Sequence, residues 1–268
     1  TKATRDLSLY DARQLISGDP GSVVSLRILR SAERPQTLKV TRGAVKVPDS
    51  ESRIESGRVG VIKVHGLEEG ESENIRNQIG SFTKQGIDKL VLDLRGVAGG
   101  KLSEGVAVAN LFIASGDLGK VIGREGKVIS SFAADPAKAV FLGKLVVLTD
   151  LATAGAAEVV AAAVIERKRG EVVGERTFGA GTEQKLFPLS SGGGYLLTVA
   201  KWASPSGTPF LGEERASMGV KPSVEVKRPD TPEPLAVQNL IEDQNDDDTT
   251  PEATPVQKPE KSPEDLQL

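Results

Sequence analysis

The side chains that could carry out chemistry are few in this 268-residue chain. His65 is the only histidine and there is no cysteine. This composition excludes disulfides, thiolate catalysis, Cys-based zinc sites and metal sites built from several histidines. A Ser-His-Asp triad would have to use His65, which ends the strand-like segment IKVH. A lone histidine at a strand end is more often structural or exposed than catalytic.

Three loops are the best candidates for holding a reacting group. Each follows a predicted strand: RGVAGGK (95–101), LATAGAAE (151–158) and RTFGAGTEQK (176–185). The ends of parallel strands gather such loops into one cleft. Gly99 and Gly100 allow backbone N–H groups to turn toward a ligand. A helix beginning near Gly155 would aim its free amides, including that of Ala156, at the same place. Together these features are what an oxyanion hole needs.

The polar side chains near these loops also have structural interpretations. Thr153 and Ser204 could replace a missing nucleophile, but each has a simpler explanation. Thr153 is expected to hydrogen-bond to the loop backbone, and Ser204 and Ser206 are expected to form a turn around Pro205. Lys168 and Lys185 could replace a missing base, but both also have structural explanations. Lys168 lies at the end of a predicted helix, where a positive charge is favourable, and Lys185 begins a predicted strand. A catalytic lysine must be desolvated, so we interpret both lysines as solvated.

Acidic residues of the same loops are interpreted in the same way. Glu158 and Glu175 resemble a carboxylate pair, but we favour hydrogen bonds that shape the loops over acid-base work. Asp93 and Arg95, inside LDLRG, are expected to pair and hold their loop. No Gly-Lys-Ser or Gly-Lys-Thr follows the glycines, and no GxGxxG opens a helix, so a nucleotide site is not expected.

Hydrophobic periodicity predicts the elements that position these loops. Helices are expected at 8–18, 70–86, 103–116 and 154–169, and a hairpin at 120–132 around Glu125-Gly126. Strands are expected at 22–30, 37–42, 58–67, 89–96, 145–150, 171–175, 185–189, 194–204 and 222–227, with 43–52 as a linker ending in a polar turn. The strand–helix–strand order over 58–96 predicts a right-handed crossover and a parallel pair. The fold class is therefore α/β.

Composition changes sharply at residue 229. Residues 229–268 hold seven of the fifteen prolines and eleven acidic residues against two lysines. Low hydrophobicity with high charge predicts a disordered acidic tail, interpreted as a spacer. The modest positive excess of residues 1–228 is spread along the chain, so nucleic-acid binding is not expected. No apolar run could span a membrane. Because the chain opens on TKATRDLSLYD, we interpret it as a fragment.

Several segments resemble the tail-specific, or C-terminal processing, serine peptidases. VLDLRGVAGG, TAGAAEVVAAAVIERKRGEVVGERTFGAGTEQ and LLTVAKWASPSGTPF are similar to that family's signature segments, in the same order and spacing from about residue 45 to 227. DLSLYDARQLISGDPGSVVSLRILR resembles the second half of the PDZ domain that such enzymes carry. The resemblance implies a partial PDZ domain at 1–43, a crotonase-like peptidase core at 44–228 and the tail at 229–268.

The resemblance also implies a Ser-Lys dyad and no cofactor or metal. In the family, the serine lies three residues before a glutamate, here Glu158, which puts Gly155 in the serine position. The lysine lies between two glycines, and here that segment is Gly179-Ala180-Gly181. Gly155 cannot attack a carbonyl and Ala180 cannot act as a base. Gln184 matches a family glutamine near the dyad, either as a pocket donor or as a remnant.

These residues lead to three functional hypotheses. In the first, the chain binds peptides or protein C-termini without cleaving them. In the second, it is an active serine peptidase that uses displaced residues. In the third, it is a scaffold subunit or oligomer that pairs with an active relative. For all three, the resemblance implies a bacterial periplasm or cell envelope.

Overall fold

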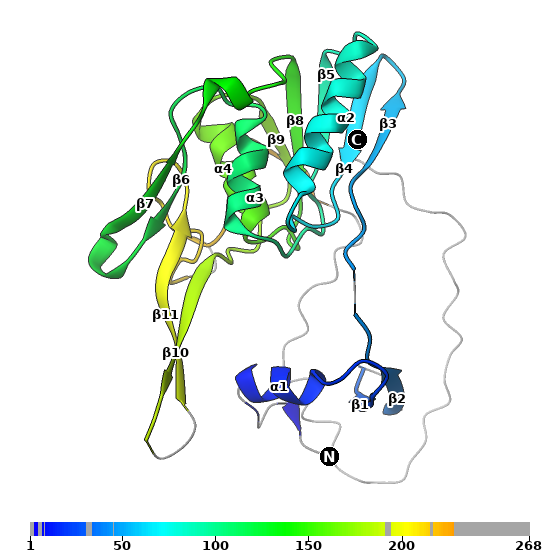
Figure 1. Ribbon diagram of the computed structural model, residues 1–268, viewed down its shortest axis with the longest axis vertical. Helices are drawn as coiled ribbons and strands as arrows, with labels where there is room; N and C mark the ends of the chain where they lie inside the picture. The colour runs from blue at the N-terminus through cyan, green and yellow to red at the C-terminus, as the bar shows by residue number, and fades with distance from the viewer. Residues whose placement is uncertain are drawn as a thin grey trace. The chain divides into compact units, whose positions relative to one another are not determined.

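The computed structural model describes residues 3–4, 7, 9–30, 34–44, 46–190, 194–214 and 217–227 (Figure 1). Its contacts divide the chain into a smaller unit up to Lys46 and a larger unit that starts at Val47. The tail predicted at 229–268 lies outside the described residues.

The smaller unit contains one helix and two strands. These are α1 (Leu9–Ile16), β1 (Val23–Ile28) and β2 (Gln36–Thr41), and the two strands form an antiparallel sheet. All three elements confirm the predicted helix and strands. Arg42 ties the end of α1 to the strands, because its guanidinium donates to the Ile16 carbonyl (2.6 Å), the Leu15 carbonyl (3.0 Å) and Ser22 Oγ (2.9 Å).

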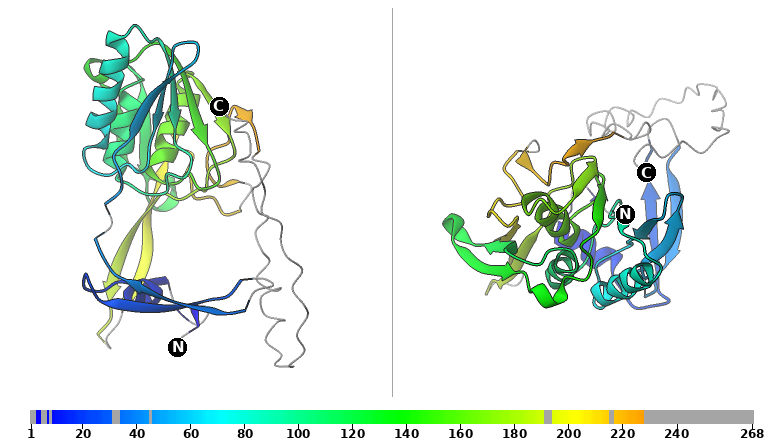
Figure 2. Two further views of the ribbon diagram at one scale, coloured as in Figure 1. Left: turned by 90° about the vertical axis from the view of Figure 1, so that its right-hand side faces the viewer. Right: turned by 90° about the horizontal axis from the view of Figure 1, so that it is seen from above.

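The larger unit is built on a six-stranded sheet with the order β12-β9-β8-β5-β4-β3. Its strands are β3 (Glu51–Glu55), β4 (Val59–Lys63), β5 (Lys89–Asp93), β8 (Lys144–Thr149), β9 (Glu171–Gly174) and β12 (Val224–Glu225). All neighbours are parallel except β3 and β4. Helix α2 (Glu71–Lys84) links β4 to β5, which confirms the predicted parallel pair, and Figure 2 shows it (cyan) along one face of the sheet.

A second sheet has four antiparallel strands in the order β10-β11-β6-β7. They are β6 (Asp117–Ile122), β7 (Val128–Ala133), β10 (Thr182–Pro188) and β11 (Gly194–Ala203). The predicted hairpin around Glu125-Gly126 is confirmed, and both residues have positive φ (58° and 75°). Figure 1 shows the β10–β11 hairpin projecting from the rest of this unit.

Helices α3 (Leu102–Asn110) and α4 (Ala156–Glu166) pack against each other, and α4 contacts both β9 and β6. Helix α4 therefore joins the two sheets. Alanine suits this crowded place because it fills little volume and favours helix, and Ala156 through Val164 are all buried. Glycine is required at position 105, because a Cβ there would overlap sterically with the Ala156 carbonyl oxygen.

Two sequence predictions need correction. The stretch 43–52 is not a linker throughout, because the edge strand β3 begins at Glu51; its fully exposed side chains left no apolar alternation to detect. The helix predicted over 103–116 ends at Asn110 rather than at Gly116. The Asn110 side chain donates to the carbonyls of Ile113 (2.9 Å) and Asp135 (3.0 Å), a tertiary contact that holds the chain in a turn.

Candidate functional site

Three loops meet at the carboxyl ends of β5, β8 and β9, as their positions in a parallel sheet require. The loop after β5 accepts a hydrogen bond at the Val97 carbonyl from Ala154 N (2.8 Å). The loop after β8 accepts one at the Thr153 carbonyl from Phe178 N (2.9 Å). Backbone hydrogen bonds thus hold all three predicted loops side by side.

Gly155 lies at the centre of these contacts, immediately before α4. Its backbone has φ 64° and ψ −116°, a conformation that strains any residue with a Cβ. There is nevertheless room for a side chain: a Cβ at Gly155 would lie 3.7 Å from Trp202 Cζ3 and 4.0 Å from the Ala180 carbonyl oxygen. A small side chain would therefore fit at position 155 at the cost of backbone strain, and glycine provides none.

Ala180 is the direct neighbour of Gly155. Gly155 N donates to the Ala180 carbonyl oxygen at 3.0 Å, although the two residues belong to different loops. Ala180 is half-buried and contributes only a methyl group. The two positions that the sequence resemblance paired are therefore adjacent in space, and neither contributes a hydroxyl or an amine.

Glu158 connects the two loops from inside the protein. Its fully buried carboxylate accepts four hydrogen bonds, from Thr177 Oγ1 (2.5 Å), Gly179 N (2.7 Å), Gly155 N (2.9 Å) and Ala180 N (2.9 Å). Burial raises the pKa of Glu158, and these hydrogen bonds offset only part of that rise. Each of the two carboxylate oxygens accepts two hydrogen bonds from the loops, so Glu158 positions the loops that carry Gly155 and Ala180.

The amides proposed for an oxyanion hole lie in different surroundings. Gly99 is exposed, and its N–H has no hydrogen-bond partner within the described part of the chain. Gly100 is half-buried and bridges to Leu67. Ala156 is buried in the first turn of α4, where amides lack intrahelical acceptors.

We expect Gly100→Ala to destabilise the larger unit by about 1–3 kcal/mol. A Cβ at Gly100 would lie 2.5 Å from the Leu67 carbonyl oxygen, and its φ is 123°. Gly99→Ala is the matched control, since its Cβ would meet only Glu68 Oε1, at 3.7 Å. Urea denaturation of both variants measures the difference. Equal stability of the two would contradict the steric argument.

The side chains considered as substitute nucleophiles or bases are engaged elsewhere or exposed to solvent. Thr153 Oγ1 is buried and bonds to the Leu94 carbonyl (3.0 Å) and to Asp150, which confirms the structural interpretation. Ser204 accepts a turn hydrogen bond from Gly207 N (2.9 Å), which confirms the predicted turn. Lys168 and Lys185 are both exposed, as expected of solvated lysines.

Two further candidates lie apart from these contacts. Gln184 is an exposed residue of β10. No hydrogen bond joins its side chain to Gly155, Ala180 or Glu158. His65 is half-buried after β4, with Nε2 3.4 Å from a Glu51 carboxylate oxygen.

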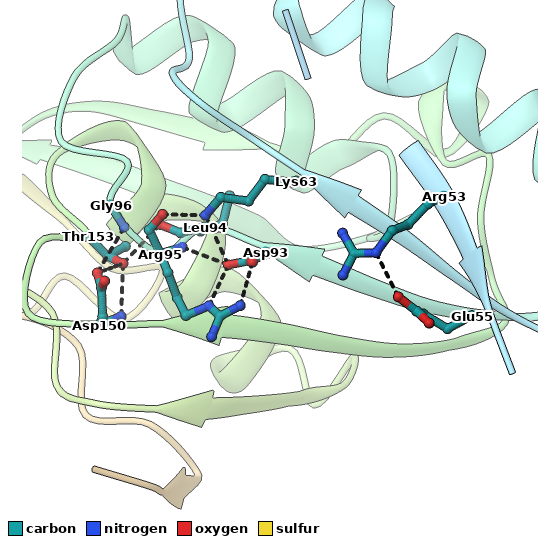
Figure 3. A network of polar contacts seen from close by, with 9 residues as sticks. All are labelled: Arg53, Glu55, Lys63, Asp93, Leu94, Arg95, Gly96, Asp150 and Thr153. Atoms are coloured by element: carbon teal, nitrogen blue, oxygen red, sulfur yellow. Dashed lines mark hydrogen bonds and ion pairs between the residues drawn. The ribbon is translucent and has the colours of Figure 1, made fainter. Parts of the chain in front are cut away.

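The loop after β5 is held by a buried ion pair (Figure 3). Arg95 donates to Asp93 through Nε (2.8 Å) and Nη2 (2.7 Å), which confirms the predicted pairing. Lys63 adds a contact of 3.3 Å to Asp93 and a hydrogen bond to the Arg95 carbonyl. Burial alone would raise the pKa of Asp93, but the hydrogen bonds from Arg95 and the charge of Lys63 lower it below its ordinary value.

Sequence reasoning missed three residues that hold the loops. Lys63 joins the Asp93 ion pair, and Asp150 accepts from Gly96 N (3.0 Å) and Ala152 N (3.1 Å) (Figure 3). Thr177 donates to Glu158 and accepts from Val220 N (2.7 Å). Position directly after a strand was a usable signal for Asp150, and position at the carboxyl end of a strand was one for Lys63. No local pattern singles out Thr177.

We expect Asp93→Asn to lower the free energy of unfolding by about 2–3 kcal/mol at neutral pH, because Arg95 stays buried beside a neutral amide. A carboxyl whose pKa is depressed by folding stabilises the protein above its unfolded pKa, and that contribution is lost as pH falls through the folded pKa. The difference between parent and variant should therefore shrink on acidification. Urea denaturation across this pH range measures it. A constant difference would exclude an ionised Asp93.

Two negative findings concern the described residues alone. None of their helices is long and apolar enough to cross a membrane. Their histidine, aspartate and glutamate side chains form no cluster of three or more that could hold a metal ion.

Comparisons with known proteins identify the family to which this chain is similar. Residues 58–226 match Peptidase family S41. The carboxyl-terminal-processing protease of Picosynechococcus sp. is 34% identical over 206 residues, covering 75% of this chain and 49% of the relative. The carboxy-terminal processing protease CtpA of Bacillus subtilis is 30% identical over 229 residues, covering 85% and 48%. The chain thus spans about half the length of these curated relatives.

A solved structure has the same fold. The photosystem II D1 C-terminal processing protease superimposes with a TM-score of 0.70 and 30% identity, over 84% of this chain and 61% of that one. The α/β fold expected from the sequence is therefore confirmed. The match to the family covers the four-stranded sheet, all three loops and every strand of the six-stranded sheet except β3, and the chain belongs to Peptidase family S41.

Proposed function

We propose that this chain binds the C-terminal segments of peptides or unfolded proteins and does not cleave them. The observation that carries the proposal is the contact between Gly155 N and the Ala180 carbonyl, 3.0 Å. It brings together the two positions that the family resemblance assigns to nucleophile and base. Neither position offers a hydroxyl or an amine, and removal of both groups abolishes nearly all covalent catalysis, because they act as a unit.

The surroundings of these positions support retained binding. The loops keep their shape through Glu158, and Gly99 keeps an exposed amide. Relatives named for carboxyl-terminal processing act on C-terminal segments, which indicates the class of ligand. The helix and two-stranded sheet of residues 9–41 agree with part of a PDZ domain, a module that takes up C-terminal segments by strand addition.

The alternative, cleavage by displaced residues, is disfavoured by specific contacts. Thr153 is fully buried, with its hydroxyl bonded to the Leu94 carbonyl and to Asp150. Lys185 is exposed, its Nζ 5.7 Å from the Phe187 ring centroid. A lysine that serves as a general base must be desolvated, and the exposed side chain of Lys185 is not.

Binding and cleavage can be tested on the same fluorescent, unstructured peptide. We expect saturable anisotropy with a free C-terminal carboxylate, weaker binding of the C-terminally amidated peptide, and no turnover above a buffer blank. An active carboxyl-terminal-processing relative serves as the positive control for cleavage. Turnover that persists after removal of any contaminating protease would overturn the proposal, as would equal or absent binding of both peptides.

We also propose a bacterial periplasm or cell envelope as the location, on the family resemblance alone. Fractionation of cells that express the natural gene tests this. Recovery in the cytoplasmic fraction would contradict it.

A further inference from the structure

We propose that two copies of this chain associate through the outer edge of β10, in one specific antiparallel register. Strand β10 is an edge strand of the four-stranded sheet, and within the described residues no strand pairs with its outer side. An unpaired edge offers a row of N–H and C=O groups to another strand. Its seven residues carry one lysine and end in Pro188, so the edge is only lightly protected.

The hairpin that carries this edge is apolar on both faces. Cross-strand pairing puts Leu186 with Leu196 on one face, and Phe187 with Tyr195 on the other. These four side chains are 39–61% exposed. A partner that continues the sheet covers apolar surface on both faces at once, whereas a partner packed on one face leaves the other exposed.

Hydrogen bonding to β11 determines which groups of β10 point outward. The Gly181 carbonyl accepts from Trp202 N (2.7 Å), so the polar groups of Gly181 face β11. The pairing of β10 with β11 contains a β-bulge between Glu183 and Gln184, and the extra residue of this bulge lies on β11. Along β10 itself, successive residues therefore keep pointing their backbone groups to alternate sides. Because polar groups alternate between the two sides of a strand, Thr182, Gln184 and Leu186 present theirs to the open edge.

A second copy of β10 fits this edge about a two-fold axis. Antiparallel pairing of a strand with itself is isologous, so the same contacts form twice. With Gln184 opposite Gln184 of the second copy, Thr182 lies opposite Leu186, and all three present backbone groups to one another. Each Glu183 then lies opposite a Lys185, which gives two opposite-charge pairs.

Charge selects this register over its neighbours. A shift of one residue pair in one direction places Lys185 opposite Lys185, and a shift in the other direction places Glu183 opposite Glu183. Like charges directly opposite each other destabilise a strand pair. A further shift, with Leu186 opposite Leu186, places Pro188 opposite Gln184 of the second copy. Pro188 has no N–H to donate to that partner. Of these registers, the one with Gln184 opposite Gln184 alone pairs opposite charges and keeps Pro188 away from the central backbone hydrogen bonds.

Cysteine cross-linking tests the register directly, because the chain has no cysteine of its own. Paired residues at a hydrogen-bonded position have Cα atoms about 5.5 Å apart, within disulfide range. Gln184→Cys is expected to form a covalent dimer on mild oxidation of the full chain. Thr182→Cys and Leu186→Cys are the matched controls, since the Cα of each would lie about 14 Å from the Cα of its own copy. No dimer from Gln184→Cys, or preferential dimerisation of Leu186→Cys, would overturn the proposal.

A charge exchange provides an independent test by sedimentation velocity over a range of concentrations. Glu183→Lys and Lys185→Glu are each expected to weaken self-association about tenfold, since each places like charges opposite each other twice. The double variant Glu183→Lys/Lys185→Glu restores opposite charges and should recover association. Circular dichroism verifies that all variants fold. A monomeric parent, or failure of the double variant to recover, would show that this edge does not pair with itself.

Discussion

The double variant Gly155→Ser/Ala180→Lys is expected to cleave peptides at least about 10³-fold faster than the parent chain, because nucleophile and base act as a unit. The two positions are already neighbours, and position 155 has room for a side chain. Gly155 N and the Ala180 carbonyl are 3.0 Å apart, and a Cβ at Gly155 meets nothing closer than 3.7 Å. The positive φ at Gly155 should cost the serine variant about 1–2 kcal/mol of stability.

The single variants Gly155→Ser and Ala180→Lys are expected to stay near the parent level, since each supplies only half of the unit. Gly155→Ser/Ala180→Arg is the matched control, because a guanidinium keeps the positive charge but cannot lose a proton to act as a base. Turnover of an unstructured peptide and labelling by a serine-directed phosphonate are the measurements. A folded Ser/Lys variant that neither turns over nor labels would show that the assigned register of the dyad is wrong.

Among the residues that hold the three loops, Glu158 is expected to give the largest loss of stability when replaced. Glu158→Ala should lower the free energy of unfolding by about 3–5 kcal/mol. The carboxylate is fully buried, and its removal leaves Gly179 N, Ala180 N and the Thr177 hydroxyl without this acceptor. The loops that carry positions 155 and 180 then lose the carboxylate to which both donate backbone hydrogen bonds.

Urea denaturation with a shared m-value measures this loss. Glu166→Ala is the matched control on the same helix. Its exposed carboxylate bonds to Ser206, and we expect a change below about 1 kcal/mol. Glu158→Gln tests the role of charge, because it keeps the shape but turns an NH₂ group toward backbone donors. A loss below 1 kcal/mol for Glu158→Ala would contradict its role in holding the loops.

Much of the larger unit was predictable from local sequence. The helix at Glu71–Lys84 and the strands on either side follow hydrophobic periodicity, which burial against a single core imposes. The alanine-rich helix at Ala156–Glu166 was equally clear, although its place between two sheets was not. Strand β3 was missed because an exposed edge strand carries no apolar alternation. The end of α3 was misplaced because hydrogen bonds from the Asn110 side chain, not a local stop signal, hold the turn that follows.

Residue types alone determined what positions 155 and 180 cannot do, because glycine and alanine have no group that attacks or accepts a proton. The sequence also predicted that Glu158 shapes the loops, but not with which partners. Only the tertiary structure decided that Gly155 and Ala180 touch, since they lie on different loops and the parallel sheet brings those loops to one edge. The tertiary structure also decided that one buried carboxylate accepts hydrogen bonds from both loops. A buried N–H without an acceptor is costly, and Glu158 is the acceptor that the amides of Gly155 and Ala180 share.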